Sequence, residues 1–439
     1  MNADRRMLPP DSEPGLAVRP AELAGLDPSP SAMAVVPVNR MFEIRDALAV
    51  YGRDFPGGEK FDASQGDGGA SLPGVPSEIY EAAHRLQVEH GSAYDQPFGC
   101  AAFRRSVVED YWQLDPGSSW GPENVLAVQG GRDGLLKAYE AALFLGRGRR
   151  GDFVITSRVP WISYSWGPYL IGANVLLAPG SEEEAWRITP EGVRTCASYV
   201  RRFDGREIAL LVITSPDNPT GRVLGLEDQA ELARAAFSAG VPFVLFDWIY
   251  HQVTDGEPGD LNRFLRLFDP AERERCLFLD GLTKSLGASN VRGAHLVASK
   301  NIVKFIQNRA SHAIVPSFYS QAVAMAAYRM GYARACAGVI GPTNQSRGIL
   351  SAFLSANGFR SIIGKGYYAF IDVGPWIDRA GFKDSADVGT YLAERFGLAV
   401  VPGVYFSVFG GRWIRFSYAL PPDKTARAAA RLKEGLASL

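Results

Sequence analysis

Short apolar runs alternate with amphipathic stretches between residues 125 and 298, and this alternation constrains the fold of the 439-residue chain more than any other feature. The runs are 125–128, 153–156, 174–178, 208–214, 242–247, 276–280 and 294–298. Uninterrupted apolar runs separated by helical stretches predict buried strands in a largely parallel sheet that helices cover on both faces. We therefore expect an α/β fold that binds any ligand at the carboxyl ends of its strands.

The segments outside this alternation predict a second, smaller unit. Residues 76–90 and 102–113 have the apolar spacing of amphipathic helices. After about residue 335 the expected elements are a helix at 343–357, a strand at 366–372, a helix at 385–396, a strand at 412–418 and a helix at 422–437. We expect four parts: a flexible N-terminal arm at 1–35, the N-terminal part of a small domain at 36–74, a large domain at 75–334, and a C-terminal small α+β domain at 335–439. The arm is rich in Pro, Ser and Ala.

The charge balance and the cysteines argue against several classes of protein. The chain has 46 basic and 47 acidic residues and a net charge of −1, which does not favour a nucleic-acid partner. Its 4 cysteines are dispersed without metal-ligand spacing, so we expect neither a metal site nor a disulfide framework. No apolar run suits a signal peptide or a membrane span, so we expect no membrane partner and a cytoplasmic protein.

Lys284 lies just beyond the apolar run 276–280, and Arg292 lies in the loop that follows. A lysine at the end of a buried strand is costly to bury unless its amine is used. Such a lysine can hold a carbonyl cofactor covalently, and a planar guanidinium can bind that cofactor's phosphate. Together the two residues suggest pyridoxal 5′-phosphate.

Polar residues also follow two earlier apolar runs. Asp247 ends the run 242–247, with Tyr250 in the same turn, and Asn218 lies in the Pro-bounded segment 215–221. An aspartate in that position can keep a pyridine nitrogen protonated, which makes the ring an electron sink. Tyr250 offers a phenol to the ring oxygen, and the prolines present Asn218 as a stiff amide donor. These are the groups that a pyridine ring requires.

A glycine-rich turn, Gln-Gly-Gly-Arg at 129–132, follows the run 125–128 and precedes a predicted helix. Glycines let the backbone approach an anion, and the free amides of a helix N-terminus bind phosphate. We expect Gly130, Gly131 and Arg132 to form a phosphate cup.

Each of these residues also has a simpler interpretation. Asn218 suits an ordinary turn, Asp247 suits the N-cap of a helix, and Tyr250 suits core packing. Arg132 suits the first turn of its helix without any ligand. The joint occurrence of these elements in one order favours the cofactor site over the simpler interpretations.

This order, over roughly residues 40 to 439, resembles the fold type I, aspartate-aminotransferase-like family of pyridoxal-phosphate enzymes, class I/II. The resemblance rests on Asn-Pro-Thr-Gly at 218–221, Asp-x-x-Tyr at 247–250, and Lys284 with the later Arg292. It implies that family's fold, a mostly parallel sheet in a large domain beside a smaller α+β domain. It also implies that the lysine forms the Schiff base and acts as the general base, with catalytic roles for the aspartate and the tyrosine.

The resemblance assigns two further contacts within the subunit. Trp161 is expected to stack on the cofactor ring, although an ungapped alignment puts Ile162 there and Tyr164 stays open as an alternative. Arg415 is expected to bind the α-carboxylate of the substrate, because a planar bidentate fork suits a carboxylate. Arg412 is a rival for that role.

Tyr94 corresponds to the tyrosine that this family lends to the phosphate of the neighbouring subunit, which implies a homodimer with shared active sites. The chain also departs from the family pattern. Gly281 stands where a phosphate-binding serine is usual, and Thr283, beside the lysine, is the expected replacement. His295 follows the arginine loop, and we interpret it as a strand residue rather than a new group of the site.

The implied activity is that of an aminotransferase, which passes an amino group from an amino acid to a 2-oxo acid. The alternative is a lyase, cyclase or bond-forming enzyme of specialised biosynthesis, such as one using S-adenosylmethionine, because Lys284-Ser-Leu-Gly and the segment 94–104 also resemble aminocyclopropane-carboxylate synthases. A non-catalytic cofactor-binding regulator would need a DNA-binding domain, for which residues 1–35 are too few. No arginine lies in 312–317, where a dicarboxylate enzyme would use one, which does not favour aspartate or glutamate.

Overall fold

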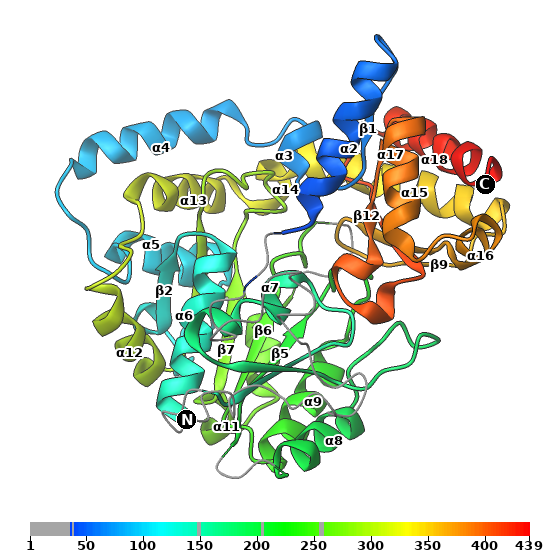
Figure 1. Ribbon diagram of the computed structural model, residues 1–439. Helices are drawn as coiled ribbons and strands as arrows, with labels where there is room; N and C mark the ends of the chain where they lie inside the picture. The colour runs from blue at the N-terminus through cyan, green and yellow to red at the C-terminus, as the bar shows by residue number, and fades with distance from the viewer. Residues whose placement is uncertain (1–35, 37–38, 147–150, 203–205, 254–258) are drawn as a thin grey trace.

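The computed structural model describes residues 36, 39–146, 151–202, 206–253 and 259–439 (Figure 1). The expected flexible arm at 1–35 lies outside the described residues. Within them, no helix combines the length and the apolar character needed to cross a membrane.

A seven-stranded sheet lies at the centre of the fold. In spatial order its strands are β2 (Val125–Val128), β8 (Ala294–Ala298), β7 (Cys276–Asp280), β6 (Phe243–Asp247), β5 (Ile208–Thr214), β3 (Phe153–Thr156) and β4 (Asn174–Leu177). Strand β8 is antiparallel to both of its neighbours, and all other pairs are parallel. The predicted α/β class and the largely parallel sheet are confirmed, and each strand lies within one residue of its predicted bounds.

The strands are mostly apolar because both faces of the sheet are covered. Leu277 and Leu279 of β7 belong to one apolar cluster, which includes helix α6 (Gly131–Gly146) and helix α12 (Lys300–Ala310). Cys276 and Phe278 belong to the opposite cluster, which includes helices α8 (Pro190–Val200), α9 (Leu226–Ser238) and α13 (Phe318–Met330). Successive side chains of a strand point to opposite faces, so an uninterrupted apolar run follows from burial on both sides.

The C-terminal part forms a second, antiparallel sheet. Its four strands, in order, are β12 (Val401–Pro402), β13 (Trp413–Ser417), β10 (Tyr368–Asp372) and β9 (Ser361–Ile363). The helices of this part are α15 (Ala337–Ala356), α16 (Gly374–Ala380), α17 (Ser385–Phe396) and α18 (Pro422–Ala437). The predicted helix at 343–357 begins earlier, at Ala337, because its burial against α18 carries the helix through Pro342.

An early segment of the chain packs with this C-terminal part. Strand β1 (Phe61–Asp62) pairs in parallel with β11 (Leu398–Ala399), and helix α2 (Met41–Asp54) packs against α17, as the blue and orange ribbons of Figure 1 show. This arrangement carries residues 64–67 to the carboxyl edge of the central sheet, where they line a cavity.

Shorter elements connect these parts. They are α3 (Gly68–Ser71), α4 (Ser77–His90), α5 (Ala101–Ser106), the π-helix η3 (Val107–Tyr111), η4 (Pro122–Asn124), α7 (Ile162–Ser165), η5 (Pro168–Ile171), α10 (Leu261–Arg266), α11 (Pro270–Arg273), α14 (Tyr332–Ala335), η6 (Gly403–Tyr405) and η7 (Val408–Gly410). The single helix predicted at 102–113 is therefore an α-helix that continues as a π-helix.

Candidate active site

A cavity of about 500 Å³ lies where the carboxyl ends of β5, β6 and β7 meet the C-terminal sheet. Ten of the sequence-predicted residues line it: Gly131, Arg132, Trp161, Asn218, Asp247, Tyr250, Thr283, Lys284, Arg292 and Arg415. Residues from separate apolar runs meet here because parallel strands all present their carboxyl ends at one edge of the sheet.

Lys284 places its amine inside this cavity. The Nζ atom donates a hydrogen bond to the carbonyl oxygen of Gly66 at 2.8 Å. The pKa of Lys284 is lowered to about 8, chiefly by loss of contact with bulk water; nearby Asp67 opposes this shift and the arginines add to it. A substantial fraction of this amine is therefore unprotonated at mildly alkaline pH, which is the form that attacks a carbonyl.

Asp247 ends β6 and is almost completely buried. Its Oδ2 accepts a hydrogen bond from the hydroxyl of Tyr164 at 2.8 Å, and its Oδ1 accepts one from the backbone N–H of Ile249 at 3.1 Å. Burial raises the pKa of Asp247 to about 6, while the two hydrogen bonds and Lys284 oppose that rise. Trp161 and Tyr164 both line the cavity, and the hydroxyl of Tyr164 is held by Asp247.

Arg415 on β13 crosses into the cavity from the C-terminal sheet. Its Nη1 donates to the Oδ1 of Asn218 at 2.8 Å, and its Nη2 donates to the backbone oxygen of Ser64. The side chain is 2% exposed, and no carboxylate among the described residues pairs with it. Its rival Arg412 is half exposed and ion-paired with Asp378 at 2.7 Å. Of the two, only Arg415 is available to an anion in the cavity.

Two phenol hydroxyls continue a series of polar contacts that begins at the amide of Asn218. The Nδ2 of Asn218 lies 3.4 Å from the hydroxyl of Tyr250, which lies 2.9 Å from the hydroxyl of Tyr368. The guanidinium of Arg415 stands 4.2 Å above the ring of Tyr368. The sequence analysis missed Tyr368, since it reads as an ordinary aromatic residue of a strand.

The other end of the cavity is electropositive. Gly130 has a φ of +77° and precedes helix α6, whose first two residues, Gly131 and Arg132, line the cavity. The guanidinium of Arg292 lies against that turn, with Nη2 3.3 Å from the oxygen of Gln129. A Cβ on Gly130 would lie 2.6 Å from Nη2 of Arg292, so only glycine lets the arginine approach. Arg132 lies with its guanidinium 5.4 Å from the ring centre of Trp161.

The hydroxyl groups near this end differ from the expected set. The hydroxyl of Thr283 donates to the oxygen of Gly293 at 2.6 Å, so its hydrogen is already engaged. A Cβ on Gly281 would lie 2.9 Å from Cα of Ala294, which leaves no room for a serine there. Ser289, which the sequence analysis missed, lines the cavity; its Oγ is buried and has no hydrogen-bond partner among the described residues. Its only sequence signal was its closeness to Arg292.

Two other residues considered in the sequence analysis, Tyr94 and His295, stand apart from the cavity, whereas Gly130, which does not line it either, directly precedes Gly131 in the wall. Tyr94 is fully exposed and does not line it. His295 lies in β8, as expected, and is buried. Its Nε2 accepts a hydrogen bond from the indole N–H of Trp112 at 2.9 Å, and burial lowers its pKa to about 3. His295 is therefore a neutral core residue.

Taken together, the α/β fold and a cavity that holds an amine, a carboxylate and an anion-binding end define a candidate site for a phosphorylated carbonyl cofactor. The family model "Aminotransferase class I and II" matches residues 59–432. The chain belongs to the class I and II aminotransferase family. It is a pyridoxal-phosphate-dependent aminotransferase, which acts on an amino acid and a 2-oxo acid.

Relatives and solved structures agree with that assignment. An aspartate aminotransferase of Bacillus subtilis is 26% identical over 82% of this chain and 87% of its own length. An aspartate/prephenate aminotransferase of Thermus thermophilus is 28% identical over 81% of this chain and 86% of its own. A Thermus thermophilus aspartate aminotransferase structure with maleate has a TM-score of 0.76 at 23% identity, covering 93% of this chain and 100% of that one, which shows the same fold. The lyase alternative is not favoured by these names.

Proposed function

We propose that Lys284 is the covalent anchor of pyridoxal 5′-phosphate and that amino-group transfer takes place in the cavity around it. The observation that carries the proposal is the position of the Lys284 amine, which shares one cavity with buried Asp247 and with the buried, carboxylate-free guanidinium of Arg415. When bound, this cofactor supplies an electron-withdrawing ring that stabilises the charge left at the α-carbon after proton removal.

The residues present fit each part of that cofactor. The N-terminus of α6, Arg292 and the unpartnered hydroxyl of Ser289 suit a phosphate. The carboxylate of Asp247 suits a protonated ring nitrogen, because Tyr164 and the Ile249 N–H fix its orientation from behind.

Contacts to the ring and to the substrate follow from the same geometry. Trp161 offers a flat surface for the ring, and Tyr250 and Asn218 offer hydrogen bonds to its oxygen. Arg415 binds the α-carboxylate and so orients the α-carbon toward Lys284. The released amine of Lys284 then removes the α-proton, and its lowered pKa suits it to act as a base near neutral pH.

An acidic amino acid is the donor that we propose. The curated relatives are named for aspartate. The cavity also holds Arg45 and Arg132, and no acidic side chain among the described residues pairs with either. This proposal departs from the expectation based on the missing arginine at 312–317. A panel of aspartate, glutamate, alanine and phenylalanine tests it: kcat/KM should be highest for an acidic donor, and a higher value for phenylalanine would overturn it.

The domain division also supports a site between two parts. We propose a large domain at 75–334 and a small domain made of 36–74 and 335–439. The pairing of β1 with β11 and the packing of α2 on α17 support the second. Arg415 and Ser64 then come from the small domain, and Lys284 from the large one.

Ser289→Ala should weaken binding of the phosphorylated cofactor about 10- to 100-fold, because a hydrogen bond to a charged group contributes roughly 1.5–3 kcal/mol. Binding of dephosphorylated pyridoxal should be unchanged, since it lacks the phosphate. Titration of the apoenzyme with each compound, followed by absorbance, makes this comparison. Ser285→Ala is the matched control, because Ser285 is also a buried serine near Lys284 but does not line the cavity. Equal weakening for both compounds would exclude a phosphate contact.

We also propose a homodimer in which Tyr94 of each subunit completes the partner's phosphate site. Its full exposure in one subunit supports this. Tyr94→Phe should weaken cofactor binding, and mixing that variant with Lys284→Ala should restore one intact site in each hybrid dimer. A mixture no more active than its separate components, or a fully active monomer in ultracentrifugation, would contradict the shared site. A cytoplasmic location stays a prediction.

A further inference from the structure

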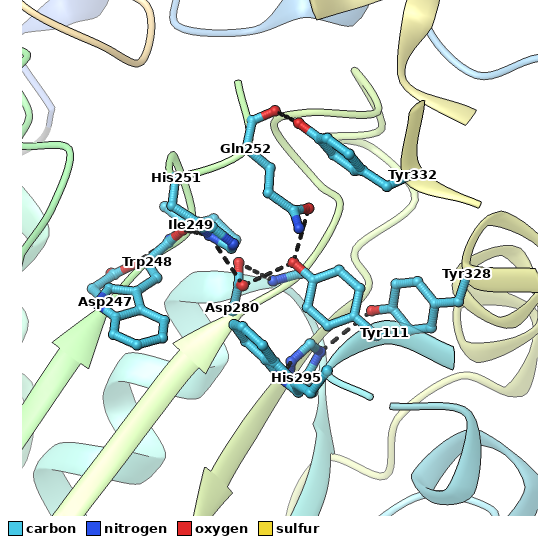
Figure 2. Close-up of polar contacts among 12 residues, drawn as sticks. Tyr111, Asp247, Trp248, Ile249, His251, Gln252, Asp280, His295, Tyr328 and Tyr332 are labelled. Carbon is cyan, nitrogen blue, oxygen red and sulfur yellow. Dashed lines mark hydrogen bonds and ion pairs between the residues drawn. The ribbon is translucent and has the colours of Figure 1, made fainter. Parts of the chain in front are cut away.

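A buried polar network lies behind the cavity, where the turns after β6 and β7 meet (Figure 2). Asp280, the last residue of β7, is at its centre; it is 1% exposed and does not line the cavity. Its Oδ1 accepts a hydrogen bond from the Gly281 N–H at 2.6 Å. Its Oδ2 accepts one from the hydroxyl of Tyr111 at 2.8 Å and lies 3.2 Å from Nδ1 of His251.

His251 connects this carboxylate to the turn after β6. Its Nδ1 lies 2.6 Å from the backbone oxygen of Trp248, which can only accept, so Nδ1 carries the hydrogen. That hydrogen is shared between the Trp248 oxygen and Asp280. The N–H of that same peptide bond, which belongs to Ile249, donates to the carboxylate of Asp247. A continuous set of contacts therefore runs from Asp280 to the carboxylate that faces the cavity.

Asp280 also holds the turn that carries the lysine. Its bond to the Gly281 N–H fixes the first peptide of the segment from Gly281 to Lys284. Further along that segment, the hydroxyl of Tyr367 donates to the Lys284 backbone oxygen at 2.6 Å. Asp280 therefore contacts both turns. It meets His251 in the turn that follows Asp247, and it bonds Gly281 in the turn that leads to Lys284.

The third contact comes from the π-helix η3. Tyr111 is the last residue of that helix, and its hydroxyl also lies 3.1 Å from Oε1 of Gln252. The hydroxyl of Tyr332 donates to the backbone oxygen of the same Gln252. Single-turn π-helices often occur at functional sites, because the extra residue per turn redirects a side chain. Here the redirected side chain is the phenol that meets Asp280.

A carboxylate is energetically unfavourable at the buried position of Asp280. Burial of an unpaired carboxylate costs several kcal/mol, and packing alone is served as well by an apolar residue. From these contacts we infer that Asp280 is a positioning residue of the aminotransferase reaction, which sets Asp247 and Lys284 relative to each other through the two turns. The inference rests on the proposed roles of those two residues.

The charges of the groups around Asp280 determine what a substitution at this residue changes. The titratable groups that face Asp280 from the elements packed around it are His251, His295, Tyr111, Tyr328, Tyr332 and Asp247. Burial lowers the pKa of His251 to about 4, so this imidazole is neutral near pH 7. Burial raises the pKa of Asp280 well above its usual range, while the hydrogen bonds from the Gly281 N–H and the Tyr111 hydroxyl oppose that rise and Asp247 adds to it.

Asp280→Asn in the holoenzyme tests the inference. Both carboxylate oxygens of Asp280 accept from donors, so the amide NH2 of an asparagine must oppose either the Gly281 N–H or the Nδ1–H of His251. One of the two links is therefore lost while the volume is kept. We expect kcat to fall about 10- to 100-fold with KM for the donor within about twofold, because misplacement of catalytic groups slows chemistry more than binding. The pH midpoint of the cofactor absorbance should also shift, since a displaced Asp247 carboxylate changes the electrostatic environment of the bound ring.

Tyr111→Phe is the second variant, because it removes one bond to Asp280 and keeps the ring. Its matched control is Tyr328→Phe, which removes a neighbouring phenol whose hydroxyl meets His295 at 3.3 Å instead. Tyr111→Phe should lower kcat, Tyr328→Phe should not, and the double variant Asp280→Asn with Tyr111→Phe should be less than additive.

The outcomes separate this inference from the proposed function. Unchanged kcat and absorbance midpoint in a cofactor-loaded Asp280→Asn protein would overturn the inference, as would equal loss in Tyr111→Phe and Tyr328→Phe. If Asp280→Asn does not fold, the pair of tyrosine variants decides. Failure of the wild-type protein to transfer amino groups would instead defeat the proposed function, whereas the absorbance midpoints would still report on Asp280.

Discussion

Lys284→Ala should abolish covalent attachment of pyridoxal 5′-phosphate and lower amino-group transfer by at least 10²- to 10⁴-fold, roughly the contribution of a general base alone. The reason is that one amine both anchors the cofactor and removes the α-proton. Mass spectrometry after borohydride reduction checks attachment: the wild-type protein should carry the label on the peptide containing Lys284. Label on another lysine would contradict the assignment.

The matched control is Lys300→Ala, because Lys300 is an exposed lysine of α12 that pairs with Glu123, away from the cavity. That variant should bind the cofactor and turn over like the wild type.

The pH dependence of cofactor attachment gives a further check on Lys284. Its pKa is lowered to about 8, so the rate of cofactor attachment to the apoenzyme should rise with pH and level off above about 8. A midpoint at the ordinary lysine value would contradict the burial of its amine.

Asp247→Asn should retain the cofactor and lower kcat about 10²- to 10³-fold, the loss that follows removal of one preorganised electrostatic partner. Asparagine keeps the shape and can still accept the hydrogen bond from Tyr164, but it cannot hold a proton on the ring nitrogen by charge. Steady-state kinetics and cofactor content measured on the same sample separate loss of chemistry from loss of binding.

Asp217→Asn is the matched control for that variant. Asp217 is a half-buried aspartate, and desolvation raises its pKa to about 6 as well, but its carboxylate accepts a hydrogen bond from Thr220 within its own turn and does not line the cavity around Lys284. If both asparagine variants lose activity equally, the effect comes from loss of a buried charge in general. Activity close to wild type in Asp247→Asn would remove it from the mechanism.

Local patterns account for the parts that the sequence predicted well. Strands of a sheet covered on both faces are apolar on both sides over most of their length, so β5 and β7 were recognisable as apolar runs. Asp247 and Lys284 were recognisable because each is polar and stands at or just beyond the end of such a run. The same argument located Asn218 in its proline-bounded turn.

Non-local contacts account for the parts that it missed. Ser64 and Gly66 bind Arg415 and Lys284 through backbone oxygens, which have no sequence signature, and the pairing of β1 with β11 brings them there. Asp280 looked like the polar end of a strand, because its partner Tyr111 is remote in sequence and lies in a π-helix. Periodicity predicted an ordinary helix at that position.

The measurement that tests the account most directly is a single half-reaction. Purified holoenzyme is mixed with an amino acid donor alone, and the cofactor and the products are then identified by absorbance and mass. The account predicts conversion of the pyridoxal form to pyridoxamine 5′-phosphate, release of one 2-oxo acid per cofactor, and neither product with Lys284→Ala. Retention of the pyridoxal form together with a product of side-chain elimination or cyclisation would contradict it.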